Sequence, residues 1–375
     1  MSAATAIGNL SMKAVRRVLS AHKPVVRRVK RFARARERDA MTGQALAVED
    51  ELASVASGTG PVIAGPWLAE VGYEVLYWVP FLRWFQRQYR VPPERLVAFS
   101  RGGAGAWYQD VASRSIEIFD YVSAAEFTAL NDERQRTEEV GGRKQFNRDG
   151  ALESRLMAAG RRALDVGVEG ATALSPSLMF RLFRDVWHGN LAPEFLWSRT
   201  RYVRLTRPPR PELRGLPSEY VAVKLYNGRT LPDTAANREA LRTMVATIAD
   251  RVPVVLLETE LVDDHADFEL AGIPNVISAR PWLTAPTNLA VQTALIAHAS
   301  HFVSTCGGLA WLAPFLGVRT AAVYADDSLL APHLLLARQA GRRTGAADFC
   351  AVDLRAWATL GAGVTVGARN GPITT

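Results

Sequence analysis

The strongest local signal in this chain is the run His301-Phe302-Val303-Ser304-Thr305-Cys306-Gly307-Gly308-Leu309. An apolar run passes into small hydroxyl-bearing residues and two glycines, and a second apolar run continues to Leu316. This pattern predicts a strand over 301–304, a tight turn and a helix over 309–316. Glycine lets a ligand approach the backbone, and the N–H groups at a helix start suit an anion such as a diphosphate. We expect a phosphate-binding loop, with an ordinary strand-to-helix turn as the alternative, at Ser304, Thr305, Cys306, Gly307 and Gly308.

Short apolar runs alternate with helical periods on both sides of this loop. In the second half of the chain, strands are expected over 220–226, 252–257 and 319–324, with helices over 235–250 and 286–299. In the first half, strands are expected over 62–65, 96–100 and 116–119, helices over 71–89, 152–166 and 176–188, and an exposed polar loop over 131–150. Such alternation favours parallel strands in doubly wound sheets, which bind ligands at the carboxyl ends of their strands. The sequence therefore predicts an α/β protein with two Rossmann-like domains that face each other across a cleft.

Two breaks in the pattern place the domain boundaries. Gly58-Thr59-Gly60-Pro61 precedes the first expected strand, and Arg207-Pro208-Pro209-Arg210-Pro211 separates the two alternating regions. Clusters of glycine and proline are typical of linkers. We therefore expect a basic extension over 1–57, an N-terminal domain over 58–206 and a C-terminal domain over 207–375.

The positive charge of the chain is concentrated near its start. The net charge is +8, but residues 13–38 hold eleven Lys or Arg and one acid, a local charge of +10, so the remainder carries 8 − 10 = −2. This distribution argues against a nucleic-acid-binding body. Apolar residues recur between the basic ones at near-helical spacing, which predicts an amphipathic helix that lies on an anionic membrane surface. A solvated arm, interrupted at Pro24, is the alternative.

Cysteine content and hydropathy point to the cytoplasm. Cys306 and Cys350 are the two cysteines, so no disulfide framework is expected. No run approaches the roughly 18 apolar residues of a membrane span, and residues 1–12 lack the order of a secretory signal. We expect a cytoplasmic protein, held at the inner face of the plasma membrane if the basic segment binds there.

The most informative run of the first half is Gly65-Pro66-Trp67-Leu68-Ala69-Glu70-Val71-Gly72-Tyr73-Glu74. It joins the first expected strand to a helix and should face the cleft. Gly65 and Gly72 would keep the backbone open to an acceptor, and Trp67 and Tyr73 would stack on a sugar.

Three charged side chains complete this expected acceptor site. Glu70 is the first choice for the general base that deprotonates an acceptor hydroxyl, with Glu74 behind it, although Glu70 can also serve as a helix cap. Arg101, at the end of the next strand, would bind a phosphate or carboxylate of the acceptor.

Part of the second half resembles a known family. Asn288-Leu289-Ala290, the run from Cys306 through Gly308, Leu312-Ala313 and Leu316-Gly317-Val318 are similar to the C-terminal domain of GT-B glycosyltransferases, and most of all to the heptosyltransferase type of bacterial surface polysaccharide synthesis. That family's loop reads Asp-Ser-Gly-x-x-His-Leu-Ala, and here Cys306 stands at the Asp position and Trp311 at the His position. The resemblance implies a nucleotide-sugar donor in the C-terminal domain, a carbohydrate or glycolipid acceptor in the N-terminal domain, and no metal or other cofactor.

The same resemblance implies cations near the diphosphate. Lys224 and Arg229 flank Asn227-Gly228 at the end of the first strand of the C-terminal domain and would offset charge on the leaving group. Glu258 would accept a hydrogen bond from a ribose hydroxyl, as acids do at the analogous position in dinucleotide folds. Asp263-Asp264-His265 can in principle hold a metal, although a solvated loop is the simpler interpretation.

Three functional classes fit these observations. A glycosyltransferase, inverting or retaining, fits best. A nucleotide-sugar epimerase shares the fold but needs several acid or base groups near the sugar, and a non-catalytic module would bind nucleotide or polysaccharide without turnover. The motifs of dinucleotide-binding, P-loop, α/β-hydrolase and zincin enzymes do not occur in the sequence.

Overall fold

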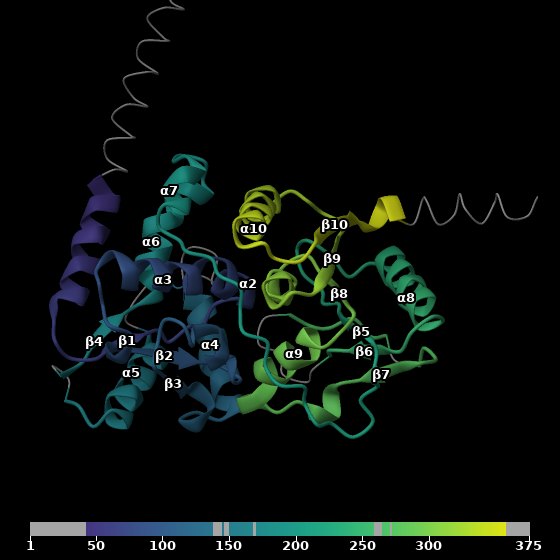
Figure 1. Ribbon diagram of the computed structural model, residues 1–375, viewed down its shortest axis with the longest axis horizontal. Helices are drawn as coiled ribbons and strands as arrows, with labels where there is room; N and C mark the ends of the chain where they lie inside the picture. The colour runs from purple at the N-terminus through teal and green to yellow at the C-terminus, as the bar shows by residue number, and fades with distance from the viewer. Residues whose placement is uncertain are drawn as a thin grey trace, which may run out of the picture.

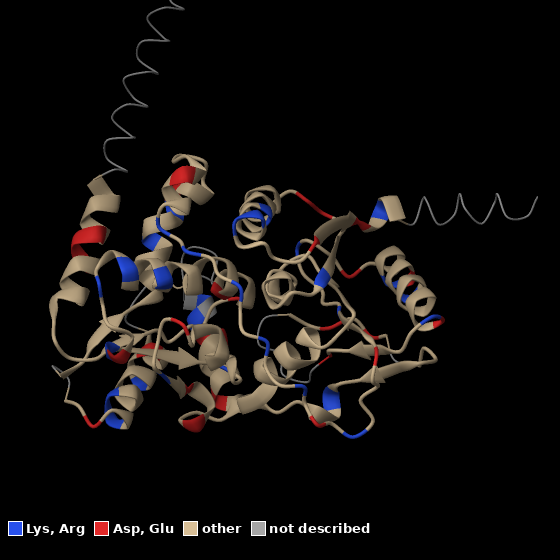
Figure 2. Ribbon diagram, in the orientation of Figure 1, with Lys and Arg blue, Asp and Glu red and all other residues tan. Residues whose placement is uncertain are grey.

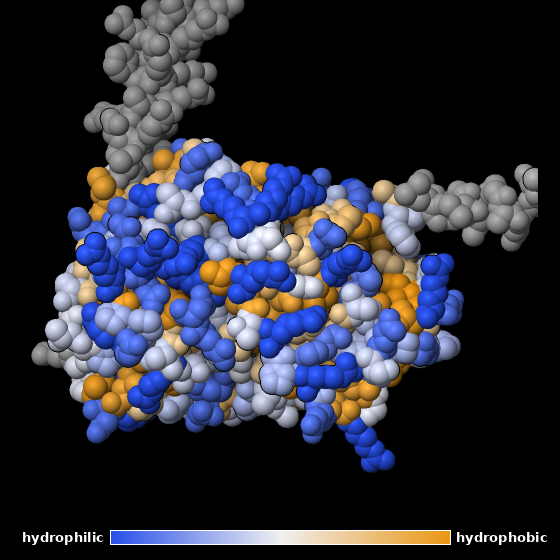
Figure 3. Space-filling view, in the orientation of Figure 1, coloured by the Kyte–Doolittle hydropathy of each residue, from blue (hydrophilic) through white to orange (hydrophobic). Residues whose placement is uncertain are grey.

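The computed structural model shows two parallel sheets, each flanked by helices, that lie next to each other (Figure 1). It describes residues 43–137, 145, 150–167, 170–258, 265–270 and 272–357. The basic segment 13–38 lies outside these residues. Over the described part, basic and acidic residues are distributed across both domains (Figure 2), and hydrophilic residues dominate the face shown in Figure 3.

Among the described residues, the N-terminal sheet has four parallel strands in the order β3-β2-β1-β4, which are Arg114–Glu117, Leu96–Ser100, Val62–Ala64 and Thr172–Leu174. The described helices around this sheet are a helix over 43–57, α2 Val71–Tyr73, α3 Val79–Gln88, α4 Ala124–Thr137, α5 Ala151–Ala163, α6 Pro176–Trp187 and α7 Pro193–Trp197. The strand order changes direction between β1 and β4, so the loop after β1 leaves the sheet at the switch point where α/β folds bind ligands.

The C-terminal sheet has six described parallel strands in the order β10-β9-β8-β5-β6-β7, which are Phe349–Asp353, Arg319–Tyr324, His301–Thr305, Val221–Lys224, Val254–Leu256 and Val276–Ser278. Its helices are α8 Ala235–Ala249, α9 Asn288–Ala297 and α10 Ala331–Thr344. This is the strand order of the Rossmann fold, with its switch point between β5 and β8. The expected α/β fold of two Rossmann-like domains is thereby confirmed.

The segment after α2 is a π-helix, Glu74–Trp78, that continues into α3. Pro80 has no N–H group, so it cannot donate to the carbonyl of Leu76 one turn earlier. The Tyr202 hydroxyl donates to that carbonyl at 2.8 Å instead. A residue of the segment between the domains therefore satisfies the backbone group that Pro80 leaves open.

Two expectations about the N-terminal half are corrected. Residues 43–57 form a helix whose Ala45, Val48 and Leu52 are buried in the main hydrophobic core, so this part of the expected extension belongs to the N-terminal domain. The expected exposed loop over 131–150 begins inside α4, and its Gln145 is buried.

The helix expected over 309–316 is absent. The described residues form two short 3-10 helices there, η8 Gly308–Ala310 and η9 Ala313–Leu316. Pro314 lacks an N–H donor, and Gly317 ends the second turn in the left-handed conformation at φ +81°. No long helix dipole therefore stands behind the glycine loop.

The domains meet along the carboxyl ends of their strands. A Cβ atom at Gly72 would lie 3.0 Å from the backbone nitrogen of Gly308. The Ala290 N–H of α9 donates to the Gly102 carbonyl after β2 at 2.9 Å, and the Trp107 indole donates to the Thr293 hydroxyl at 3.1 Å. The boundary expected at 207–211 falls in the segment that joins α7 to β5.

Within the described residues, no helix is long and apolar enough to cross a membrane.

Candidate functional site

The glycine loop lies at the switch point of the C-terminal sheet. The N–H groups of Gly307, Gly308 and Leu309 donate to none of the described residues. Gly307 and Gly308 have φ values of +146° and +44°, so the backbone adopts conformations that favour glycine. These three adjacent N–H groups can donate to a bound anion without the help of a long helix.

Tyr226, just beyond β5, covers this loop and was missed by the sequence analysis. Cβ atoms at Gly307 and Gly308 would lie 2.8 and 3.1 Å from the Tyr226 hydroxyl oxygen, so no larger residue fits beneath the phenol. The Tyr226 ring stacks on the His265 imidazole, with centroids 5.0 Å apart and an interplanar angle of 12°. The hydroxyl therefore adds a further donor beside the N–H groups.

The side chains of the loop itself face the protein interior, which corrects three expectations. The Thr305 hydroxyl donates to the Tyr226 carbonyl at 3.0 Å and accepts from the Tyr226 N–H at 2.9 Å, so it ties β8 to the end of β5. Ser304 is fully buried, and Cys306 is buried against the core. Phosphate contact at this loop therefore rests on backbone groups rather than on these side chains.

Burial raises the pKa of the Cys306 thiol to about 12, so the group stays protonated at neutral pH. Cys350 is exposed. We expect iodoacetamide at pH about 8 to alkylate Cys350 and to spare Cys306 until the protein is unfolded, as peptide mass spectrometry would show. Rapid alkylation of Cys306 in the folded chain would contradict this placement.

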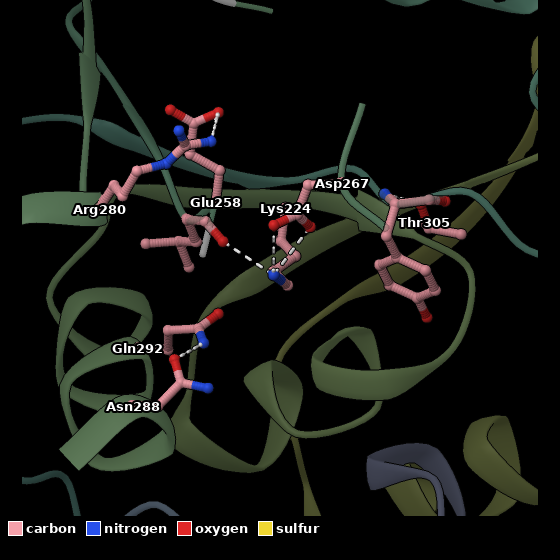
Figure 4. A network of polar contacts seen from close by, with 9 residues as sticks. Lys224, Glu258, Asp267, Arg280, Asn288, Gln292 and Thr305 are labelled. Carbon is pink, nitrogen blue, oxygen red and sulfur yellow. Dashed lines mark hydrogen bonds and ion pairs between the residues drawn. The ribbon is translucent and has the colours of Figure 1, made fainter. Parts of the chain in front are cut away.

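The two expected cations differ in their surroundings. The Lys224 ammonium donates to the Leu257 carbonyl and to Asp267, both at 2.9 Å, so its charge is already neutralised (Figure 4). Lys224 thus acts first as a structural link between β5 and the segment 265–270. Arg229 is exposed and forms no ion pair with any described residue, so of these two cations it is the one that an anionic ligand can reach.

Glu258 follows β6, as expected, but it is largely buried. Its carboxylate lies 3.7 Å from the guanidinium of Arg280 (Figure 4). The Arg280 side chain is partly exposed, so solvent and ligands can reach the pair from that side. A ribose hydroxyl that approaches there would have to compete with Arg280 for the Glu258 carboxylate.

The loop Gly65–Ala69 in the N-terminal domain is held by buried polar side chains. Gln145 accepts from the Leu68 N–H at 2.7 Å and donates to the Pro66 carbonyl at 3.1 Å. Arg134 donates to the Leu68 carbonyl at 3.2 Å, and Arg101 to the Ala69 carbonyl at 3.3 Å. This network fixes the backbone that leads to Glu70.

The same arrangement corrects four expected acceptor or catalytic residues. Trp67 stacks between Trp78 and Phe180 inside the core, and Gly65 is buried beneath it. Arg101 is buried behind the loop, and Glu74 is fully buried with its carboxylate accepting from the Tyr108 hydroxyl at 2.5 Å. These side chains shape the loop and do not line an acceptor surface.

Glu70, Gly72 and Tyr73 lie at the domain junction. Glu70 occupies the N-cap position of α2 in an extended conformation, and its side chain makes no capping hydrogen bond. Burial, followed by the nearby Glu70 charge, raises the pKa of Tyr73 above its ordinary range. Gly72 packs against Gly308, so Glu70 lies two residues along the chain from a direct contact with the glycine loop of the other domain.

A polar groove of about 470 Å³ lies beside the ends of β2 and β3. Arg114 and Asp120 line it from the N-terminal domain, and Pro286 borders it from the C-terminal domain. Glu117 shapes its floor by accepting from the N–H groups of Gly102 and Gly103 at 2.8 and 2.9 Å.

No metal centre is visible in the described part of the chain, where no three His, Cys, Asp or Glu residues converge. Asp263 and Asp264 of the expected metal-type cluster lie outside the described residues, and His265 stacks on Tyr226.

No protein-family model matches the chain, and no curated protein matches it by sequence. Several solved structures are similar to it in fold. E. coli heptosyltransferase WaaC with ADP is 14% identical over 80% of this chain and 98% of its own, with a TM-score of 0.40. A glycosyl transferase family 9 protein from Veillonella parvula DSM 2008 is 11% identical over 82% and 89%, with a TM-score of 0.41.

UDP-GlcNAc 2-epimerase from Methanocaldococcus jannaschii is also similar, at 9% identity over 78% of this chain and 88% of its own, with a TM-score of 0.31. The heptosyltransferase type that the glycine loop resembles is thus among the structural neighbours, together with an epimerase. These proteins resemble the chain in outline, and the chemistry of its cleft has to follow from its own residues.

Proposed function

We propose that the chain is a glycosyltransferase that moves a sugar from a nucleotide-sugar donor to a carbohydrate or glycolipid acceptor in surface polysaccharide synthesis. One observation carries the proposal: three adjacent backbone donors at Gly307–Leu309 lie at a Rossmann switch point, where Gly308 packs against Gly72 of a second Rossmann-like domain. A donor held on one side and an acceptor on the other would meet at this junction.

The residues supply the groups that such a transfer needs. The Gly307–Leu309 N–H groups, the Tyr226 hydroxyl and Arg229 would bind the diphosphate and stabilise its charge as the sugar departs. Glu70 would remove the proton of the acceptor hydroxyl. The groove lined by Arg114 and Asp120 offers paired donors and acceptors to a polyhydroxylated acceptor.

The proposal also covers location. The enzyme would work in the cytoplasm, with residues 13–38 on an anionic membrane surface, which is where a glycolipid acceptor lies. It needs neither a metal nor another cofactor, because backbone donors and Arg229 supply the positive potential.

A thermal-shift panel of UDP, GDP, ADP, CMP and dTDP tests the nucleotide half of the proposal. A ligand at 100 times its Kd adds about 2.7 kcal/mol to the free energy of unfolding, so a bound nucleotide raises the melting temperature. No shift at millimolar concentration for any of the five would refute nucleotide binding. Incubation of the matching nucleotide-sugar alone then separates transfer from epimerisation, because an epimerase converts its substrate without an acceptor.

Gly308→Ala should weaken nucleotide binding at least about tenfold, because the new methyl group would lie between the loop donors and the Tyr226 hydroxyl, 3.1 Å away. Gly345→Ala is the matched control: its φ is +60°, so it has the same backbone penalty, and no atom lies within 4 Å of its new Cβ. Equal nucleotide-induced shifts in both variants would move the phosphate site elsewhere.

A further inference from the structure

In the described part of the C-terminal domain, two buried polar side-chain atoms have no hydrogen-bond partner, the Gln292 Oε1 and the Ser304 Oγ. Gln292 is 1% exposed. Its Nε2 donates to the Asn288 Oδ1 at 2.6 Å, one helical turn earlier, which fixes the plane of the carboxamide (Figure 4). Buried polar atoms are nearly always paired in folded proteins, so this pair of exceptions calls for an explanation.

Both atoms lie toward the carboxyl edge of the C-terminal sheet. Helix α9 packs on the sheet face that carries Ala222 and Phe302, and Ser304 follows Phe302 by two residues, so it belongs to the same face. Side chains of a helix lean toward its N-terminus, which for α9 is the end next to Gly102 and the domain junction. Gln292 therefore leans toward the edge where Lys224 and Glu258 stand (Figure 4).

The carboxamide pair also lies close to the N-terminal domain. A Cβ atom at Gly102 would lie 3.4 Å from the Asn288 Cβ, and the adjacent Gly102 carbonyl accepts from the Ala290 N–H. The start of α9, which carries Asn288, therefore lies where the two domains touch. The diphosphate donors at Gly307–Leu309 begin three residues after Ser304 in the chain.

The chemistry of the two orphan atoms specifies the ligand. The Gln292 oxygen is an acceptor and needs a donor, while the Ser304 hydroxyl can both donate and accept. A diphosphate oxygen cannot donate to the Gln292 oxygen, whereas a sugar hydroxyl can. A leucine at position 292 would avoid the burial of an unpaired oxygen, so the glutamine is difficult to explain by packing alone.

We propose that Gln292, held in place by Asn288, binds a hydroxyl group of the transferred sugar and so selects the donor. This inference rests on the proposed function, because it names the sugar subsite of the same donor site. Gln292 discriminates by hydrogen bonding, and a donor that lacks the matching hydroxyl leaves its oxygen unpaired.

The test compares Gln292→Met with the full-length parent chain. The affinities of the best nucleoside diphosphate from the panel and of its glucose or mannose conjugate are measured by calorimetry. In Gln292→Met the nucleoside diphosphate should bind within about twofold of the parent, and the extra affinity for the conjugate should fall about tenfold or more. Gln86→Met is the matched control, since Gln86 also donates through Nε2, to the Val111 carbonyl, but on α3 away from the junction.

A second measurement on the parent chain does not depend on a folded variant. Conjugates that lack single sugar hydroxyls are compared on the parent chain, and one deletion should cost about tenfold in affinity. Where Gln292→Met folds, it should abolish that cost. If the nucleoside diphosphate binds but neither the variant nor any deletion changes sugar preference, the inference is wrong while the proposed function stands. If neither nucleotide nor conjugate binds the parent, the proposed function itself fails.

Discussion

Glu70→Gln is expected to lower the turnover number for glycosyl transfer by about 10²- to 10⁴-fold, the usual contribution of a positioned general base. The amide keeps the size of the carboxylate but cannot accept the acceptor's proton. Nucleotide binding should be unchanged, because Glu70 belongs to the N-terminal domain and the diphosphate donors to the other. Steady-state rates with saturating donor and acceptor give the measurement.

Glu94→Gln is the matched control for this substitution. Glu94 is an exposed glutamate of the same domain, next to the amino end of β2 and hence at the opposite edge of the sheet from the cleft. The turnover number of Glu94→Gln should equal that of the parent. A Glu70→Gln variant with full activity would remove Glu70 from the chemistry and leave only a binding role for this segment.

Glu117→Gln should lower the free energy of unfolding by about 2–4 kcal/mol at neutral pH. Both carboxylate oxygens accept hydrogen bonds, from the Gly102 and Gly103 N–H groups and from the Ser100 hydroxyl at 2.9 Å. A carboxamide has one acceptor oxygen, and its NH₂ group would face donors. Chemical denaturation of the variant measures the loss, and Glu94→Gln should unfold at the parent's midpoint.

The pH dependence of this effect follows from the Glu117 pKa. Burial raises the pKa of the Glu117 carboxyl above the ordinary 4.5. The hydrogen bonds that the carboxylate accepts lower the pKa but do not cancel the effect of burial. The folded state therefore binds the proton more tightly than the unfolded state, so this contribution to stability is present at and below pH 4.5 and is lost as pH rises through the folded pKa. The stability difference between parent and variant should be larger at pH 4.5 than at neutral pH. A difference that grows as pH rises would mean that the hydrogen bonds outweigh burial.

The sequence predicts best those elements that are continuous and buried. The expected strands over 96–100 and 319–324 coincide with β2 and β9, because apolar runs of this length have no competing helical period. Strands β4, β7 and β10 are short or only partly buried, so their composition hardly differs from that of loops. The helix expected over 309–316 does not form, and Pro314 within this range already argued against it because proline cannot donate a helical hydrogen bond.

The site is less predictable because the sequence does not say which way a side chain points. The glycine loop and the Glu70–Tyr73 segment reach the domain junction because topology alone sends strand ends there. Trp67 is a residue type that often stacks on sugars, yet here it stacks on Trp78 and Phe180 in the core. The sequence analysis did not predict a role for Tyr226 or Gln292. A tyrosine after a strand and a glutamine within an apolar helix belong to no local sequence motif that indicates ligand binding.

The bond from Tyr202 to the Leu76 carbonyl has a mechanical consequence. The Arg201 N–H also donates to the Pro80 carbonyl, while on the other side the Leu205 N–H donates to the Phe315 carbonyl of the C-terminal domain. The crossover between the domains is therefore anchored at both ends, and only Val203 and Arg204 lie between the anchors. Any hinge rotation has to be absorbed by the backbone dihedral angles of these two residues or has to break the anchors. We expect the two halves to move together through small angles, so that the cleft is preorganised for its ligands rather than assembled by a wide closure.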